Sequence, residues 1–415
     1  MNLNVCRYQY LLCSTIYLIL LLILNPTASA QNYERYKKLK DTTLTSKFLG
    51  TPKNLTITVP IEWQTGTPNK FPVIVVFDRQ NKRSHQYILN AIDYLTSNEQ
   101  MPSAVIISVE SEQRYRYVET LHQVTDPAGK AERNEQFIFE EIIPMAQNEL
   151  KASDFKLFIG HSRYGYFTTS LFNNRIQDLN GVIALSPFFV QPKINLTKSL
   201  RELSKVPLKA KKYFRFTIGN DFPEDYKAID SALKQMSGIK PSTAVNNPET
   251  TISFTNANLD MKGSIFKAAD HNVTPGIYVT QALYEIFEAW SIIQNRYSSI
   301  GQMDLSTKGL LEREIVSHYG TSLNFSLGVL NGKGWQFYNE KQYDKAIEAW
   351  KILTDTYPNF SDGYLYLLQA QKGANKPYAD TIQKFKQSLA NSSFYNESQK
   401  KALQAELDEI INAKN

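Results

Sequence analysis

Cysteine is nearly missing from this sequence. Of the 415 residues only Cys6 and Cys13 are cysteines, and both lie in an amino-terminal segment that we expect to be removed. The mature chain would then have no disulfide framework, no thiolate zinc site and no cysteine nucleophile. No other segment is long and apolar enough to span a bilayer, so we expect no stable membrane insertion after cleavage.

The amino-terminal segment has the features of a secretory signal peptide. Arg7 precedes an apolar run, Leu11–Leu24, and the small residues Ala28–Ala30 form a cleavage site. This pattern predicts a signal peptide at residues 1–30, a mature chain that begins at Gln31, and a periplasmic or extracellular location. An uncleaved membrane anchor is the alternative, although the run is short for a spanning helix.

A strong excess of charge is absent as well. The chain has 46 Lys and Arg against 40 Asp and Glu, a formal net charge of +6, and no long basic run. We therefore expect no nucleic-acid partner. The length suits one large domain and a smaller one.

Short apolar runs alternate with amphipathic stretches of helical length over much of the chain. The runs that resemble buried strands are Phe71–Phe77, Ala104–Val109, Phe155–Ile159, Val182–Leu185 and Tyr213–Ile218. This alternation predicts an α/β fold with a mostly parallel sheet covered by helices, in a domain at residues 31–300.

The carboxy-terminal part is helical in pattern and has no predicted strand. The residues that follow the spacing of a tetratricopeptide repeat are Leu330, Gly334, Phe337, Tyr343, Ala346, Trp350 and Pro358. We expect a linker at residues 301–322 and a tetratricopeptide-like helical region at residues 323–415, which would offer a surface to a protein partner. A plain helical hairpin that only braces the first domain is the alternative.

A serine on a sharp turn is the main candidate for chemistry. The apolar run Phe155–Ile159 leads through Gly160 to Ser162, and a helix-compatible segment follows. Strand, tight turn and helix form the layout of a nucleophile elbow, which presents the serine hydroxyl above the sheet edge. The usual elbow has a glycine two residues after the serine, whereas this sequence has Tyr164 there and a glycine one residue later.

The scarcity of histidine allows the general base to be chosen by elimination. His85 and His122 precede the serine, which is the wrong order for this fold. His161 adjoins the serine on the turn, and His318 falls in the expected linker. His271 remains, on a loop before a long helix, where the order serine, acid, histidine places the base.

Three carboxylates compete to be the acid that orients this base. Asp221 follows a predicted strand directly, and Glu224 and Asp225 lie close enough to remain alternatives. Asp270 is the neighbour of His271 in the chain and is badly placed to orient its ring.

The oxyanion hole should use two backbone N–H groups. One is that of Arg163, the residue after the nucleophile, and the second comes from the turn after Phe77, for which we choose Arg79. The Arg163 side chain and Tyr164 are the expected substrate-binding groups, with a guanidinium that favours carboxylate or catecholate oxygens. The alternative for Arg163 is a pairing with a surface acid.

Residues 50–295 resemble the esterase D-like branch of the α/β-hydrolases. The matching motifs are Phe71–Asp78, Phe139–Pro144, Gly160–Ser162, Ala184–Pro187 and Asp270–His271. That branch includes S-formylglutathione hydrolases, feruloyl and acetyl-xylan esterases, and ferric siderophore esterases. The resemblance implies a three-layer α/β/α hydrolase fold and a serine carboxylesterase that uses neither metal nor other cofactor, with Ser162, His271 and Asp221 as its triad.

The sequence thus predicts an exported serine carboxylic-ester hydrolase that works through an acyl-enzyme. Small-molecule or glycan-linked esters, including siderophore and polysaccharide-linked acyl esters, are the expected substrates. Two alternatives remain open. One is a catalytically weak hydrolase fold that serves as an interaction module through its helical repeats, and the other is an acyltransferase.

Overall fold

The described part of the chain begins after the expected signal peptide. The structure is a computed structural model, and it describes residues 35–413 except 222, 236–241, 247–248, 257 and 299–303. The signal peptide predicted at residues 1–30 lies outside the described residues. Within the described ranges, no helix combines the length and apolar character needed to cross a membrane.

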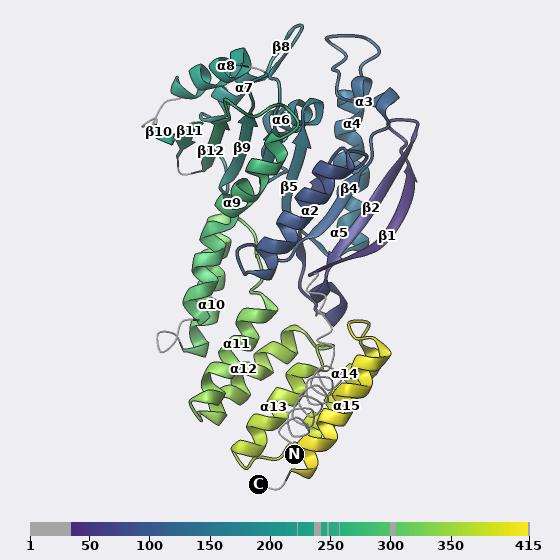
Figure 1. Ribbon diagram of the computed structural model, residues 1–415, viewed down its shortest axis with the longest axis vertical. Coiled ribbons are helices and arrows are strands. Elements are labelled where there is room, and N and C mark those ends of the chain that lie inside the picture. Colours follow the sequence, from purple (N-terminus) through teal and green to yellow (C-terminus); the bar gives the residue numbers. More distant parts are fainter. Residues whose placement is uncertain are drawn as a thin grey trace, which may run out of the picture. The chain divides into compact units, whose positions relative to one another are not determined.

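One ten-stranded sheet lies at the centre of the fold, in the spatial order β1-β2-β4-β3-β5-β6-β9-β12-β11-β10 (Figure 1). Its strands are β1 (Tyr36–Thr45), β2 (Pro52–Pro60), β3 (Phe71–Val76), β4 (Val105–Val109), β5 (Ala152–His161), β6 (Gly181–Leu185), β9 (Lys212–Ile218), β10 (Ser242–Asn246), β11 (Glu249–Thr255) and β12 (Leu259–Ile265). The six strands from β4 to β12 in this order run parallel, and the strands at both edges pair antiparallel. The mostly parallel sheet confirms the predicted fold class.

Alternating side chains of the central strands build two separate apolar cores. In β3, Ile74 and Val76 belong to one core and Val73 and Val75 to the other, because successive side chains of a strand point to opposite faces. The first core includes α2 (Lys82–Ser97) and α9 (Thr274–Ser298). The second includes α4 (Ala131–Phe137), α5 (Ile143–Glu149), α6 (Arg163–Asn174), α7 (Leu196–Leu203) and α8 (Pro223–Lys234). The sheet between two helical layers gives the expected three-layer arrangement.

Helices alone make up the carboxy-terminal part. They are α10 (Lys308–Tyr319), α11 (Leu327–Asn339), α12 (Tyr343–Thr356), α13 (Asp362–Gly373), α14 (Ala379–Asn391) and α15 (Glu397–Asn412). The segment predicted as a linker, residues 301–322, thus contains α10. A Cβ added to Gly334 would lie 2.2 Å from the Trp350 ring nitrogen, so α11 and α12 approach closely at this glycine. The tetratricopeptide repeat and the domain boundaries stay predictions.

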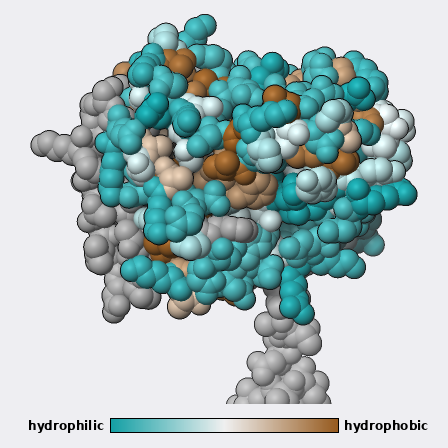
Figure 2. Space-filling model, turned by 90° about the horizontal axis from the view of Figure 1, so that it is seen from above, coloured by the Kyte–Doolittle hydropathy of each residue, from teal (hydrophilic) through white to brown (hydrophobic). Residues whose placement is uncertain are grey.

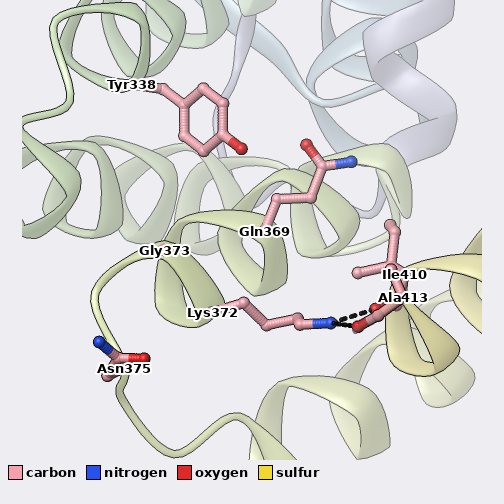
Figure 3. A pocket seen from close by; sticks show the side chains of 7 residues that line it. All are labelled: Tyr338, Gln369, Lys372, Gly373, Asn375, Ile410 and Ala413. Atoms are coloured by element: carbon pink, nitrogen blue, oxygen red, sulfur yellow. Dashed lines mark hydrogen bonds between the residues drawn. The ribbon is translucent and has the colours of Figure 1, made fainter. Parts of the chain in front are cut away.

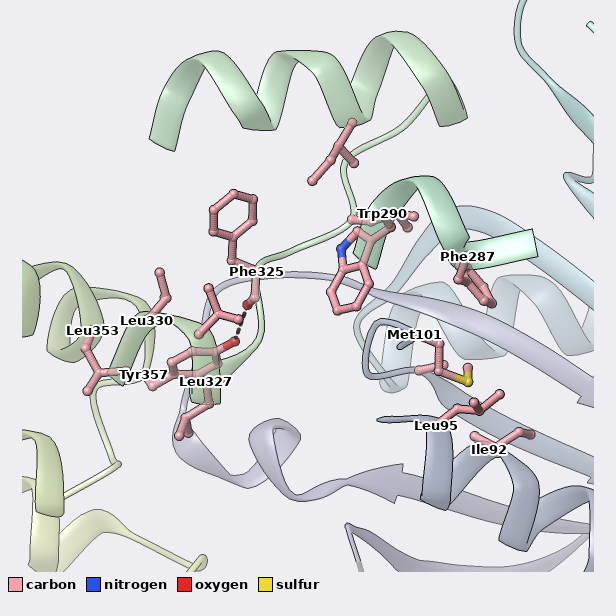
Figure 4. Packing of buried hydrophobic residues seen from close by; sticks show 14 of the residues in the cluster. Ile92, Leu95, Met101, Phe287, Trp290, Phe325, Leu327, Leu330, Leu353 and Tyr357 are labelled. Carbon is pink, nitrogen blue, oxygen red and sulfur yellow. Dashed lines mark hydrogen bonds between the residues drawn. The ribbon is translucent and has the colours of Figure 1, made fainter. Parts of the chain in front are cut away.

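The core beneath α9 continues into these helices (Figure 4). The indole N–H of Trp290 in α9 donates to the carbonyl of Asn324 (3.2 Å). The hydroxyl of Tyr357, which follows α12, donates to the carbonyl of Phe325 (3.0 Å). Trp290 of α9 and Tyr357 after α12 are thus joined through the segment at Asn324 and Phe325, and both belong to one apolar cluster.

Candidate active site

The predicted nucleophile lies on a strained turn between β5 and α6. Ser162 has a φ of 58° and a ψ of −118°, a region that costs a non-glycine residue about 1–3 kcal/mol. A Cβ at Gly160 would lie 2.2 Å from the carbonyl oxygen of Tyr164, so only glycine fits where the turn closes. This local geometry is that of a nucleophile elbow.

Tyr164 fills the position where the usual elbow has a glycine. Its side chain is buried at 1% exposure, and its ring stacks on Phe77 with centroids 4.7 Å apart. The hydroxyl donates to Glu119 (3.1 Å) and accepts from Ser111 (2.5 Å). Because the whole side chain is enclosed, the prediction that Tyr164 binds substrate is wrong.

Gly165 provides the close approach that a glycine one position earlier usually provides. A Cβ there would lie 3.1 Å from Pro187 and 3.2 Å from the carbonyl of Leu185, at the end of β6. Tyr164 is therefore directed away from this contact and into the second core. The one-residue shift of the glycine leaves the turn itself intact.

His271 and Asp221 meet next to the elbow. His271 Nδ1 donates to Asp221 Oδ2 at 2.5 Å, which leaves Nε2 as the nitrogen able to accept a proton. The ring of His161, which precedes the serine, lies 4.6 Å from that of His271, and its Nε2 donates to the His271 carbonyl (2.8 Å). Burial lowers the pKa of His161 to about 4, so its ring is neutral at neutral pH.

The other two candidate acids point elsewhere. Glu224 is exposed and pairs with Lys227 (2.7 Å). Asp225 accepts the backbone N–H of Phe189 (3.0 Å). Of the three carboxylates left open by the sequence, Asp221 is the one that the structure brings to His271.

The second expected oxyanion donor is misassigned. The backbone N–H of Arg79 donates to the carbonyl of Val109 (3.1 Å), so it is already engaged and the prediction of Arg79 is wrong. The preceding residue, Asp78, has a φ of 62°, and its backbone N–H donates to no acceptor in the described part of the chain. Its carboxylate pairs with Arg116 (2.7 Å), which also donates to the carbonyl of His161 (3.2 Å). A positive φ at a non-glycine residue gives no signal in the sequence, which is why Asp78 was missed.

A second serine–histidine–carboxylate set lies deeper in α6, and sequence reasoning did not find it. His122 Nδ1 donates to Glu132 (2.9 Å), and the hydroxyl of Ser170 donates to His122 Nε2 (3.2 Å). Ser170 is 2% exposed and lies within the helix. Because this hydroxyl is enclosed, it is not open to a substrate here, and the set connects α6 to the loop before α4.

A cavity of about 440 Å³ lies apart from the catalytic candidates, among the carboxy-terminal helices (Figure 3). Its lining residues are Tyr338, Gln369, Lys372, Gly373, Asn375, Ile410 and Ala413. The Lys372 ammonium donates to the carbonyls of Ile410 and Ala413 (2.5 and 2.9 Å), at the end of α15. The cavity brings together no nucleophile and base.

Comparison with known proteins defines the fold. No protein family model and no curated protein matches the sequence. An IroE-like serine hydrolase from Shewanella oneidensis is similar in structure, with a TM-score of 0.58 and 14% identity, over 76% of this chain and 98% of that one. The chain has an α/β-hydrolase fold. An uncharacterised protein from Capnocytophaga ochracea is similar over 90% of this chain and 99% of its own, with a TM-score of 0.54 and 12% identity.

Proposed function

We propose that this protein is a serine hydrolase of carboxylic esters. The observation that carries the proposal is the conjunction of a strained Ser162 at the elbow with a His271–Asp221 hydrogen bond beside it. A serine hydroxyl is a weak nucleophile by itself, and an adjacent base oriented by a carboxylate activates it.

The reaction divides into two acyl transfers. Ser162 Oγ attacks the ester carbonyl while His271 Nε2 takes its proton, and the tetrahedral intermediate collapses when His271 returns that proton to the leaving alcohol. Water then attacks the acyl-enzyme while His271 takes its proton. The second tetrahedral intermediate collapses by cleavage of its bond to Ser162 Oγ, which regains the proton from His271, and the carboxylic acid is released. Asp221 holds the His271 proton on Nδ1 and stabilises the imidazolium that forms.

Two backbone donors would stabilise the oxyanion. The N–H of Arg163 is at the first position of α6, where a helix has no internal acceptor for it. The N–H of Asp78 is the second donor in this proposal, in place of that of Arg79. The Asp78–Arg116 ion pair balances the carboxylate charge that would otherwise repel the developing oxyanion.

The wider setting of the proposal comes from the sequence. The expected signal peptide supports action in the periplasm or outside the cell, on siderophore or polysaccharide-linked acyl esters or on smaller esters. The IroE-like serine hydrolase supports a hydrolase assignment by analogy of fold. The helices from residue 323 onward, with the cavity near Tyr338, would bind a protein partner.

A fluorophosphonate probe tests the proposal directly. The probe should form an adduct with the purified mature chain, and peptide mass spectrometry should locate it on Ser162. The Ser162→Ala variant should not react, whereas the Ser170→Ala variant should react as the parent does. No labelling, together with no hydrolysis of activated acetate esters, would reject the proposal and favour the interaction module. Transfer of the acyl group to added alcohols in preference to water would favour an acyltransferase.

A further inference from the structure

The side chain of Arg163 occupies an aromatic slot next to the proposed nucleophile. Its guanidinium carbon lies 4.0 Å from the centroid of Tyr117, in α3 (Gln113–Glu119), and 5.6 Å from that of Phe188, in the loop after β6. Phe188 is in turn held by Tyr166, whose ring stacks on it at 4.8 Å. A guanidinium that stacks between rings keeps its N–H edge available for a planar anion.

No carboxylate neutralises this cation within the described ranges. Its polar side-chain contacts are with neutral hydroxyls, that of Thr120, 3.5 Å from Nη1, and that of Tyr117. The acids on the surrounding elements have other partners: Asp78 with Arg116, Glu119 with Lys53, Glu112 with Arg114, and Asp225 with the Phe189 N–H. The alternative that Arg163 pairs with a surface acid therefore does not hold.

The position of the slot relative to the nucleophile limits what it can bind. Arg163 directly follows Ser162, and both residues are partly exposed. Burial lowers the pKa of the Arg163 guanidinium below its ordinary value, so part of its hydration is already lost and an incoming anion displaces less water. The exposed apolar side chains include Tyr117 of α3 and Val190 of the short strand β7 (Val190–Gln191), and Figure 2 shows hydrophobic residues gathered in the middle of the face seen from above.

We infer that the site selects esters that carry a carboxylate beside a flat apolar group, which Arg163 binds through its N–H edge while Tyr117 stacks on the flat part. This inference rests on the proposed function, because it assigns a substrate class to the same site. Neither the usual elbow pattern nor the triad requires a cation at this position. Charge-assisted hydrogen bonds of this kind correspond to a kcat/KM that is about ten-fold or more higher for an anionic ester than for a matched neutral ester.

Paired esters test the selection and tell which side of the ester bears the anion. On the acyl side, the para-nitrophenyl ester of terephthalate monoanion is compared with that of para-toluate. On the alcohol side, para-carboxyphenyl acetate is compared with para-tolyl acetate. The quantity measured is the ratio of kcat/KM for the anionic ester to kcat/KM for its neutral partner. In Arg163→Met this ratio should fall about ten-fold or more for one of the two pairs.

Two further variants separate the planar cation from charge in general. Arg163→Lys keeps the charge but loses the fork and the stacking, so its ratio should fall between those of the parent and Arg163→Met. Arg114→Met removes an exposed cation from the same helix as Tyr117, and Arg114 is paired with Glu112, so its ratio should equal that of the parent. Equal ratios in the parent and Arg163→Met for both pairs would overturn the inference.

Binding without catalysis distinguishes failure of this inference from failure of the proposed function. Terephthalate is titrated into Ser162→Ala and into Ser162→Ala/Arg163→Met by calorimetry. Binding to the first protein that the second loses supports the anion site even if the parent hydrolyses no ester. Hydrolysis by the parent, with equal or absent terephthalate binding in both variants, leaves the esterase standing and rejects the anion site.

Discussion

Two sets of a serine, a histidine and a carboxylate lie at α6, and they differ in backbone geometry and in access to the serine. Ser162 stands at the strained start of α6, whereas Ser170 lies inside the helix with an ordinary backbone. His271 and Asp221 are each exposed at about a quarter of their side-chain surface, while Ser170 is buried. The N–H groups next to Ser170 are used in the helix, so no oxyanion donor is available there.

The difference indicates that backbone placement and access, rather than the three side chains alone, would decide which set can carry out the proposed reaction. Ser170 in the helix and His122 on the neighbouring loop satisfy each other's hydrogen-bonding groups, and they stabilise the fold as any buried polar pair does. At the elbow, the same groups face solvent beside backbone donors.

Replacing the two serines should give the largest contrast. Ser162→Ala should reduce kcat for an activated acetate ester by about six orders of magnitude, because the nucleophile is lost. Ser170→Ala should keep kcat within a few-fold, since it removes only the hydrogen bonds of this hydroxyl with His122 and Asn174, inside the fold. Steady-state kinetics with active-site titration measures both. Substantial activity in Ser162→Ala would show that the elbow is not the reactive set.

Replacing the two histidines should repeat this contrast. His271→Ala should be nearly as damaging as Ser162→Ala, and the double variant should be little worse than either, because the residues act as one unit. His122→Ala should instead lower the free energy of unfolding by about 1–3 kcal/mol, since it leaves Glu132 and Ser170 without their partner. Additive losses in the His271 and Ser162 double variant would contradict a shared mechanism.

Replacing the acid should lower kcat less than replacing the serine or the histidine in the set around Ser162. Asp221→Asn should lower kcat by about four orders of magnitude, because an amide no longer fixes the His271 tautomer. Glu132→Gln keeps a hydrogen-bond acceptor for His122 and should leave kcat close to that of the parent. If Asp225→Asn were more harmful than Asp221→Asn, the acid would be misassigned in spite of the observed hydrogen bond.

The sequence allowed the parts that depend on order and periodicity to be predicted. Short continuous apolar runs between amphipathic stretches of helical length predicted the strands, and the order of serine, acid and histidine led to the residues that the structure brings together near Ser162. Arg79 failed because the register between β3 and β4 decides which N–H is free, and Val109 takes that of Arg79. The Ser170 set was missed because the loop between α3 and α4 brings His122 and Glu132 next to α6, and no local sequence pattern predicts the course of that loop.

Two tyrosines in α6 offer the finest comparison, one beside each set. The hydroxyl of Tyr164 donates to Glu119, which is buried in an ion pair with Lys53 (2.8 Å). The buried hydroxyl of Tyr166 has no hydrogen-bond partner among the residues that the structure describes, and its ring packs edge-on against His122. Tyr164→Phe should therefore lower the free energy of unfolding by about 1–3 kcal/mol, because Ser111 and Glu119 lose a partner in the core. Tyr166→Phe removes a buried hydroxyl that makes no hydrogen bond within the described residues, so it should leave the free energy of unfolding unchanged or raise it slightly.

Urea denaturation of the two variants and the parent measures this contrast, and the matched change of one oxygen atom cancels differences in side-chain volume. The same samples report on the elbow. The Tyr164 ring stacks on Phe77, next to the proposed oxyanion donor Asp78. Without its hydroxyl the ring is held less firmly in Tyr164→Phe, so kcat should fall a few-fold with little change in KM. Equal free energies of unfolding for the two variants would mean that the hydrogen bonds around Glu119 do not hold Tyr164 in place. The packing of its ring on Phe77 would then be enough to accommodate a tyrosine where the usual elbow has a glycine.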